Sequence, residues 1–388
     1  MNNYVKIEKI STTNNTLTFN ILTNGKISKY ISKNTMQIEY DFSLNDIPNS
    51  ILVIPFISNI LPLIWITNST LQIDELDETF YKQINKIKKA YQQMAKKIKL
   101  KGKIKVNKLK NNTTKTNNST KSICFFSGGV DSTSSLISHL NEKIETLTIW
   151  GSDISINNIN GWTNVKKHIN NITQKLNIPA NFCKSNFRDI INYDEINKLI
   201  IPKIKDNYWH AYQHSIAIIA HAVPYCYKEN IITIYFPATL SPKYRKRTCA
   251  SIPKIDNNFI FSNTKTIHDG YEKSRLDRIE NIANYNKSNK KKIPLRVCWQ
   301  SLNGKNCTHC EKCFRTILEL LSIKEDPKDY NFDILSSTYQ LIQYDITNLN
   351  KKDLKKYHDY YQEIKQKTKK NNLEQDDKIN WILTNKNF

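Results

Sequence analysis

The stretch ICFFSGGVDSTSSLISHL, residues 123–140, combines residue types that suit the binding of phosphate. An apolar run of four residues is followed by Ser127, Gly128 and Gly129, and a helical pattern begins near Asp131. Because the turn has small side chains or none, its backbone N–H groups are exposed at the amino end of the helix. Unpaired amides and the positive end of the helix dipole attract anions there. The sequence therefore predicts an anion-binding turn.

The residues after the turn add hydroxyls and a carboxylate. Ser132 and Thr133 can donate hydrogen bonds to a phosphate. Asp131 either caps the helix or binds a Mg²⁺ ion that accompanies the phosphates. The spacing of the Walker loop is absent from this stretch.

Four of the eight cysteines form a cluster with the spacing of metal ligands. The segment CWQSLNGKNCTHCEKCFRT, residues 298–316, has the pattern C-x8-C-x2-C-x2-C. Four thiolates complete a tetrahedral Zn²⁺ site without an open position, so the predicted role is structural. An iron–sulfur cluster is the competing assignment, and His309 is an alternative to one sulfur. The predicted ligands are Cys298, Cys307, Cys310 and Cys313.

Alternating strand and helix patterns surround the turn. Strands are expected at 123–126, 145–150, 180–187 and 231–238, and helices from about Asp131, at 165–176 and at 208–223. The near-continuous apolar character of 231–238 is typical of a parallel strand covered on both faces. The sequence therefore predicts an α/β fold with a doubly wound parallel sheet.

Ligands of such folds bind beyond the carboxyl ends of the strands. The second strand ends in IWGSD, residues 149–153. We expect backbone groups of Ile149 and Trp150 to contact an adenine ring and Gly151 to leave room for it.

The remaining residues predict additions to this domain. Residues 1–75 look mostly β, with TNGK (23–26) as a hairpin turn and the apolar stretch 51–66 as buried strands, and a helix is expected at 77–99. The expected organisation is an N-terminal β-rich domain (1–109), a linker (110–121), a nucleotide-binding domain (122–323) with a zinc knuckle (298–313), and a C-terminal helical extension (324–388).

The composition limits the classes of protein. Apolar residues make up 39% of the chain, enough for a core, but no apolar run is long enough for a membrane span, and the N-terminus lacks a signal-peptide layout. We therefore expect a cytoplasmic protein without a membrane partner. The net charge of +23 is compatible with nucleic-acid binding. It is equally compatible with a lysine-rich composition whose charges are solvated, so the nucleic-acid partner stays open.

The residues SGGVDS, between a strand and a helix, resemble the PP-loop of ATP pyrophosphatases. That family splits ATP into AMP and pyrophosphate, usually after adenylating a substrate. The resemblance implies that ATP and Mg²⁺ are bound by Ser127, Gly128, Gly129, Val130, Asp131, Ser132, Thr133, Ile149, Trp150 and Gly151. It also implies that the catalytic residues are Ser127, Asp131, Ser132 and Arg275.

The loop and the cysteine pattern, in that order, resemble the 7-cyano-7-deazaguanine synthase (QueC) family of the queuosine pathway over roughly residues 122–322. In that family the loop activates 7-carboxy-7-deazaguanine as its acyl-adenylate, and ammonia attacks to give an amide. A second ATP dehydrates the amide to a nitrile, and the four cysteines hold structural zinc.

The chain also departs from that family. It has WGSDISINNINGW where the synthase has an Asp-Tyr-Gly-Gln type turn, and it carries N-terminal and C-terminal additions that the synthase lacks. HDGYEKSRLDRIENI and CEKCFRTILEL look more like QueC-like proteins of bacterial anti-phage systems, including Qat-type and CBASS-associated operons. That resemblance implies a ligase joining a 7-deazapurine-like carboxylate to ammonia or to a protein amine, with partner proteins from the same operon.

Basic residues between 239 and 278 are candidates for the substrate pocket, because arginine grips carboxylates and phosphates in bidentate fashion. They are Lys243, Arg245, Arg247, Arg275 and Arg278, near the sequence HDG at 268–270. Each is equally compatible with an ordinary surface charge. His210, His214 and His221 drift around one helix and are interpreted as packing or surface residues.

Three other functions stay open. The first is the queuosine-pathway synthase itself. The second is a PP-loop tRNA sulfur-transferase, for which Cys183 and Cys249 are the candidate reactive cysteines. The third is a non-catalytic nucleotide-binding scaffold whose β domain and basic tail bind proteins or nucleic acid.

Overall fold

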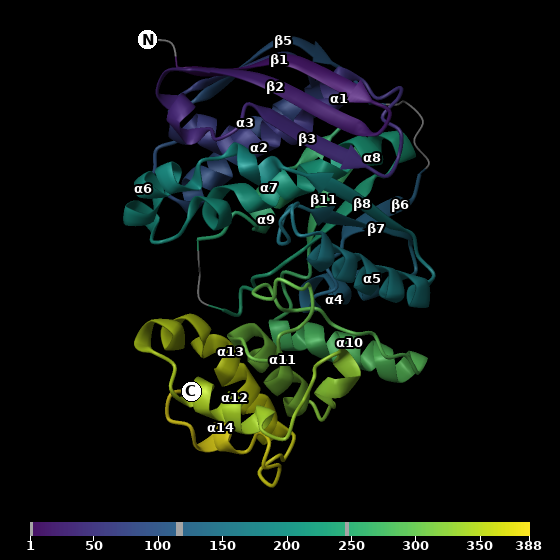
Figure 1. Cartoon of the computed structure of the whole chain (residues 1–388), viewed down its shortest axis with the longest axis vertical. Coiled ribbons are helices and arrows are strands. Elements are labelled where there is room, and N and C mark those ends of the chain that lie inside the picture. Colours follow the sequence, from purple (N-terminus) through teal and green to yellow (C-terminus); the bar gives the residue numbers. More distant parts are fainter. Residues whose placement is uncertain (1–2, 114–118, 245–247) are drawn as a thin grey trace.

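The computed structural model describes residues 3–113, 119–244 and 248–388, and a single sheet connects most of them (Figure 1). In chain order its strands are β1 (Tyr4–Thr13), β2 (Thr16–Asn24), β3 (Thr35–Tyr40), β4 (Thr70–Asp77), β5 (Lys103–Lys110), β6 (Lys121–Phe125), β7 (Lys143–Trp150), β8 (Ala180–Ser185), β9 (Thr233–Pro237), β10 (Ile260–Phe261) and β11 (Thr264–Asp269). They are arranged as β10-β11-β9-β6-β7-β8-β3-β2-β1-β4-β5.

Five adjacent strands in the middle of the sheet, β11, β9, β6, β7 and β8, are mutually parallel. Residues 122–125 of β6 and 233–236 of β9 are buried, as expected for strands covered on both faces. The prediction of an α/β fold with a mostly parallel central sheet is therefore confirmed, and the arrangement is compatible with a doubly wound fold.

The helices predicted at 77–99, from about Asp131 and at 165–176 are present. In chain order, the helices of the first half are α1 (Asn49–Leu52), α2 (Ile54–Ile66), α3 (Glu78–Met94), α4 (Val130–Ser138), α5 (Ile159–Leu176) and α6 (Tyr193–Ile204). The segment predicted as one helix at 208–223 is a run of π-helical, α-helical and 3-10 turns, Trp209–Gln213, α7 (His214–Ile219) and Ala220–Ala222, continued by α8 (Val223–Glu229). Those of the remainder are α9 (Pro253–Asp256), α10 (Arg275–Asn289), α11 (Glu311–Ser322), α12 (Thr338–Thr347), α13 (Lys351–Lys370) and α14 (Trp381–Thr384).

The N-terminal strands extend the central sheet. β3 pairs antiparallel with β8, with Ile38 opposite Ser185 and Tyr40 opposite Cys183. The N-terminal strands are therefore joined through β3 directly to β8, one of the strands that follow the SGG turn. The limits of the expected domains stay a prediction.

The prediction of buried strands at 51–66 is wrong, because these residues form α1 and α2. Every residue from Ile54 to Trp65 is buried, so the helix is apolar around its whole circumference and shows no one-sided pattern. Periodicity cannot separate such a helix from a buried strand, whereas the length of the run, which exceeds a typical strand, favours a helix.

The prediction of a hairpin turn at TNGK is also wrong. Gly25 begins a 3-10 helix, Gly25–Tyr30, that leads from β2 to β3. The tight hairpin lies earlier, between β1 and β2, where Asn14 has a positive φ of 36°. Asparagine tolerates that conformation, which explains the location of the turn.

The C-terminal helices form a second core beside the sheet (Figure 1). Residues of α11, α13 and α14 pack there with apolar residues of α10 and three of the clustered cysteines, Cys298, Cys310 and Cys313. Val130 of α4 belongs to the same core, so the helix after the SGG turn contacts both halves of the molecule. In the described part of the chain, no helix combines the length and apolar character needed to cross a bilayer.

Candidate functional site

The strand order places the SGG turn at a switch point of the sheet. The chain leaves β6 for β7 and β8 on one side, and later enters β9 on the other side of β6. A crevice is expected beyond the carboxyl ends of strands at such a point. A cavity of about 290 Å³ lies there, lined by residues from the ends of β6, β7 and β9.

Three of the predicted loop residues face this cavity, whereas Gly128 and Gly129 are not among its lining residues. Ser127, Asp131 and Ser132 line the cavity. α4 begins at Val130 without a side-chain cap, and its first intrahelical hydrogen bond runs from Thr133 N to Gly129 O, 2.9 Å. The preceding first-turn amides therefore have no partner within the helix and can receive an anion.

Two serines hold the turn in shape. The amide of Ser127 donates to Ser132 Oγ at 3.2 Å, and the two hydroxyls are also 3.2 Å apart. Val130 and Thr133, which we expected to bind the nucleotide, are buried instead. The structure thus divides the predicted loop residues into some that face the cavity and some that anchor the helix.

The two glycines of the turn have different structural roles. Gly128 has a φ of +70°, and a Cβ there would lie 2.5 Å from Nε2 of His168 on α5. Gly129 has ordinary backbone geometry, and the nearest neighbours of a Cβ at this position would lie at 3.4 Å. The requirement for glycine at 128 therefore comes from the backbone conformation and from His168.

Asp131 is an ion-paired residue and not the helix cap, because the N-cap position belongs to Gly129. Its Oδ1 lies 2.8 Å from Arg278 Nη1 and 3.8 Å from Arg275 Nη1. Burial favours the protonated acid, but these arginines outweigh it and lower the pKa of Asp131. Among the described residues, its second oxygen, Oδ2, has no hydrogen-bond or ion-pair partner.

Arg275 lies behind Asp131 and not along the cavity lining that the structure describes. Its Nε donates to Glu319 at 3.1 Å and its Nη2 to Thr316 at 2.9 Å. Burial raises the pKa of Glu319 to about 7, although Arg275 opposes the shift. The geometry gives Arg275 a role in supporting Asp131.

The other residues predicted between 239 and 278 are placed away from the cavity or outside the described residues. Lys243 pairs with Asp277 at 2.6 Å, and Arg245 and Arg247 fall outside the described residues. In the HDG sequence, His139 binds Asp269 at 3.1 Å and Asp256 binds His268 at 2.6 Å. These contacts fix α4 and α9 to the end of β11.

At the end of β7, the three residues predicted to contact adenine differ in their surroundings. Ile149 lines the cavity. The ring of Trp150 stacks on Trp162, whose side chain does line the cavity, at 5.3 Å between centroids. At Gly151, with a φ of +114°, a Cβ would lie 1.9 Å from the carbonyl oxygen of Ser185. The glycine therefore makes room for β8.

Three charged residues of the cavity were missed by the sequence reasoning. Asp153 follows β7, whereas Arg296 and Lys312 come from the segment that carries the clustered cysteines. Burial and the neighbouring Arg275 lower the pKa of Lys312. Asp153 and Lys312 are 159 residues apart, so no local sequence pattern indicates that they line the same cavity. The only hint is the sequence CEKC, which places Lys312 between two predicted metal ligands.

A cysteine–histidine pair was also missed. His214 lines the cavity, and its Nε2 lies 4.0 Å from Sγ of the buried Cys249. The other ring nitrogen, Nδ1, lies 3.0 Å from the carbonyl oxygen of His210, which orients the ring toward Cys249. His210, His214 and His221 were interpreted as packing or surface residues. His221 fits that interpretation, because it is fully buried and does not line the cavity, whereas His214 does line it.

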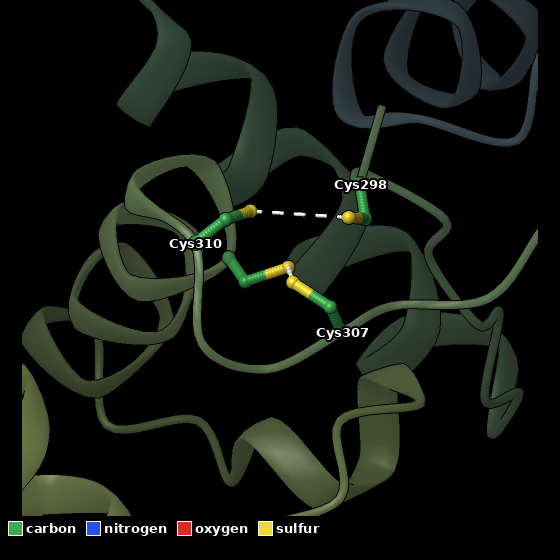
Figure 2. A group of neighbouring side chains, drawn as sticks. Cys298, Cys307 and Cys310 are labelled. Atoms are coloured by element: carbon green, nitrogen blue, oxygen red, sulfur yellow. Dashed lines mark hydrogen bonds between the residues drawn. The ribbon is translucent and has the colours of Figure 1, made fainter. Parts of the chain in front are cut away.

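The four predicted cysteine ligands converge on one point (Figure 2). All four sulfurs lie within 4.8 Å of one another, with Cys298–Cys310 and Cys307–Cys313 both at 3.8 Å. Sulfurs about 2.3 Å from a central Zn²⁺ form a tetrahedron with edges of about 3.8 Å. An iron–sulfur cluster places several atoms between its ligands and spreads them further apart. The group could therefore hold a single zinc ion.

His309 is not part of this sulfur group. Its side chain is exposed, and Nδ1 bonds to the carbonyl oxygen of Cys307 at 2.6 Å. Models of known protein families give no match to this chain, and neither does any curated protein.

We predict that Gly151→Ala destabilises the fold more than Gly270→Ala. Both glycines have a positive φ, but a Cβ at Gly270 would meet no atom within 4 Å. Gly270→Ala should cost only the backbone strain, about 1–2 kcal/mol. Gly151→Ala must also displace β8, for a total of roughly 3 kcal/mol or more. Urea unfolding followed by circular dichroism measures both, and equal losses would contradict the steric explanation.

We predict that Cys310→Ser abolishes zinc binding and lowers the melting temperature by about 5 °C or more, because Cys310 begins α11 and belongs to the C-terminal core. His309→Ala is the matched control and should retain one zinc per chain. Elemental analysis and thermal unfolding measure the two effects. Zinc retained by Cys310→Ser would show that the sulfur group is not the metal site.

Proposed function

We propose that the chain is an ATP-dependent ligase of the QueC-like type, which forms AMP and pyrophosphate while adenylating a carboxylate. The observation that carries the proposal is the SGG turn at the switch point of a parallel sheet, with Ser127, Asp131 and Ser132 lining a cavity and the first-turn amides of α4 without a partner in the helix. Cleavage between the α and β phosphates follows from the resemblance to the PP-loop family.

The residues of the cavity suit this reaction. The amides of the turn and the hydroxyls of Ser127 and Ser132 would bind phosphate oxygens. The unpartnered Oδ2 of Asp131 and the carboxylate of Asp153 are suitable ligands for Mg²⁺, which favours oxygen. A carboxylate oxygen of the substrate would attack the α phosphorus, and pyrophosphate would leave toward the turn.

The cavity also has a lining that would suit a flat ring. Trp209, Ile218 and Phe236 line it and are apolar or aromatic. Such a surface suits a 7-carboxy-7-deazaguanine-like substrate, whose activated carboxyl group would then be attacked by ammonia or by a protein amine. The four cysteines would hold structural zinc, and anti-phage defence is the role that the motifs favour.

The reaction predicts carboxylate-dependent exchange of labelled pyrophosphate into ATP, with AMP and pyrophosphate released in equal amounts. Ser132→Ala removes the hydroxyl that accepts a hydrogen bond from the amide of Ser127. It should lower the exchange rate about tenfold, which corresponds to a rise of about 1.4 kcal/mol in the activation free energy. Ser138→Ala, at the other end of α4, is the matched control and should exchange at the wild-type rate. Release of ADP and phosphate, or no exchange with any carboxylate, would overturn the proposal.

A second candidate function, tRNA sulfur transfer, is favoured by Cys249. Burial alone would raise the pKa of Cys249, but His214 and a hydrogen bond from His210 bring it down to about 6. Asp206, 2.6 Å from His210 Nδ1, helps to raise the pKa of that histidine to about 10 despite burial. A thiolate beside an ATP-binding cavity is the group that sulfur transfer requires. Loss of thiolated nucleosides on deletion of the gene would favour this function.

The thiolate makes a pH-dependent prediction. A group with a depressed pKa stays ionised down to that pKa, so alkylation of Cys249 by iodoacetamide should be constant above about pH 7. It should fall about tenfold per pH unit below pH 6. Cys183, whose pKa is raised by burial, is the internal control and should remain unmodified at pH 7. Peptide mass spectrometry measures both, and a rate for Cys249 that rises through pH 8 would contradict the prediction.

A further inference from the structure

The segment that carries the clustered cysteines also supplies two cations to the cavity. Arg296 lies two residues before Cys298, and Lys312 lies between Cys310 and Cys313. Both side chains line the same cavity as Ser127 and Ser132 of the turn. The four sulfurs and the two cations are therefore parts of one rigid unit.

Arg296 is joined directly to the SGG turn. Its backbone amide donates to Gly128 O at 2.7 Å, and its Nε donates to Ser127 O at 3.2 Å. The side chain is only 8% exposed, yet it lines the cavity. Its terminal guanidinium nitrogens have no hydrogen-bond partner among the described residues, so they are left for a ligand.

Lys312 lies in the first turn of α11, whose N-cap residue is Cys310. Within the described ranges its ammonium has no hydrogen-bond or ion-pair partner. Asp131, the acid it approaches, is already paired with Arg278 at 2.8 Å and lies 3.8 Å from Arg275. Lys312 is therefore not needed to balance the charge of Asp131.

Two cations, Arg296 and Lys312, and two carboxylates, Asp131 and Asp153, line the cavity. The wall behind Asp131 adds Arg275 and Arg278 against Glu319, which leaves one positive charge in excess. Because charges are costly to keep in a partly buried place without a partner, an anionic ligand is the natural complement. The excess is next to the amides of the turn, where a phosphate would be bound.

We propose that Lys312 and Arg296 bind the pyrophosphate portion of the nucleotide, and that metal in the cysteine group holds these two side chains in place. The proposal deepens the proposed function and rests on it for the identity of the nucleotide. Inorganic pyrophosphate is the chemical class that the two cations recognise.

The coupling to metal follows from the backbone. Cys310 and Cys313 fix the first turn of α11, which sets the direction of Lys312. On the other side, the amides of Val297 and Cys298 both donate to Asn306 Oδ1, beside Cys307. A Zn²⁺ ion bonded to all four sulfurs ties these two pieces together, whereas four metal-free thiols hold them only by weak contacts.

The test measures binding of inorganic pyrophosphate and of ATP with Mg²⁺ by calorimetry, with the zinc content determined in parallel. Lys312→Ala should weaken pyrophosphate binding about tenfold while one zinc per chain is retained, and Lys312→Arg should restore part of the affinity. Lys305→Ala, an exposed lysine of the same segment, is the matched control and should bind within about twofold of the wild type. Unchanged affinity in Lys312→Ala would overturn the proposal.

The metal is tested by chelation of the wild-type protein. Metal-free protein with an unchanged far-ultraviolet spectrum should bind pyrophosphate more weakly than zinc-loaded Lys312→Ala, because the hold on Arg296 is released as well, and added Zn²⁺ should restore it. Chelation of Lys312→Ala should cause a further loss, smaller than the loss on chelating the wild type, because only Arg296 remains to be released. Full affinity without metal would overturn the coupling, and if chelation unfolds the chain, the zinc-loaded Lys312 variants decide the assignment.

The outcomes separate this proposal from the proposed ligase. Pyrophosphate binding that depends on Lys312, without AMP release from any carboxylate, would keep the anion site and overturn the ligase. AMP release at the wild-type rate by Lys312→Ala, with unchanged pyrophosphate affinity, would keep the ligase and overturn the anion site.

Discussion

The guanidinium of Arg278 connects the parts of the molecule that form the cavity. It binds Asp131 at 2.8 Å, and it donates to the carbonyl oxygens of Thr239, Leu240 and Gly270. These partners belong to the first turn of α4, to the residues after β9 and to the turn after β11. The side chain of Arg278 is only 2% exposed, and its loss would leave the half-buried Asp131 with only Arg275, 3.8 Å away, and would remove a buried donor from three carbonyls. The position of the SGG turn relative to β9 depends on this contact.

Much of the site could be predicted because its signal is local. A strand, two glycines and a helix follow one another directly in the sequence, and the spacing of the cysteines brings the sulfurs together with little help from the rest of the chain. Other features depend on packing between distant segments. Arg275 carries the charge expected of a pocket residue, but its guanidinium is hydrogen-bonded to Glu319 on α11 and does not line the cavity. Lys312 was overlooked because its direction depends on how α11 packs.

The N-terminal part illustrates a different limit of sequence reasoning. The apolar run in α2 gave no periodic signal because neighbours cover the helix on all sides. The pairing of β3 with β8 joins Ile38 to Ser185, far apart in the sequence, and no local pattern specifies such a partner. A β-rich addition was recognisable, whereas its continuity with the central sheet was not.

The junction between β3 and β8 has a mechanical consequence. Since backbone hydrogen bonds cross it, the N-terminal strands cannot hinge against the central parallel strands as an independent body. Removing them would strip β8 of its outer partner and leave a bare strand edge, with Cys183 exposed to other chains and open to intermolecular association. The N-terminal strands therefore act as the closing edge of the sheet, and an unbroken series of paired strands joins β5 to β6 beside the cavity.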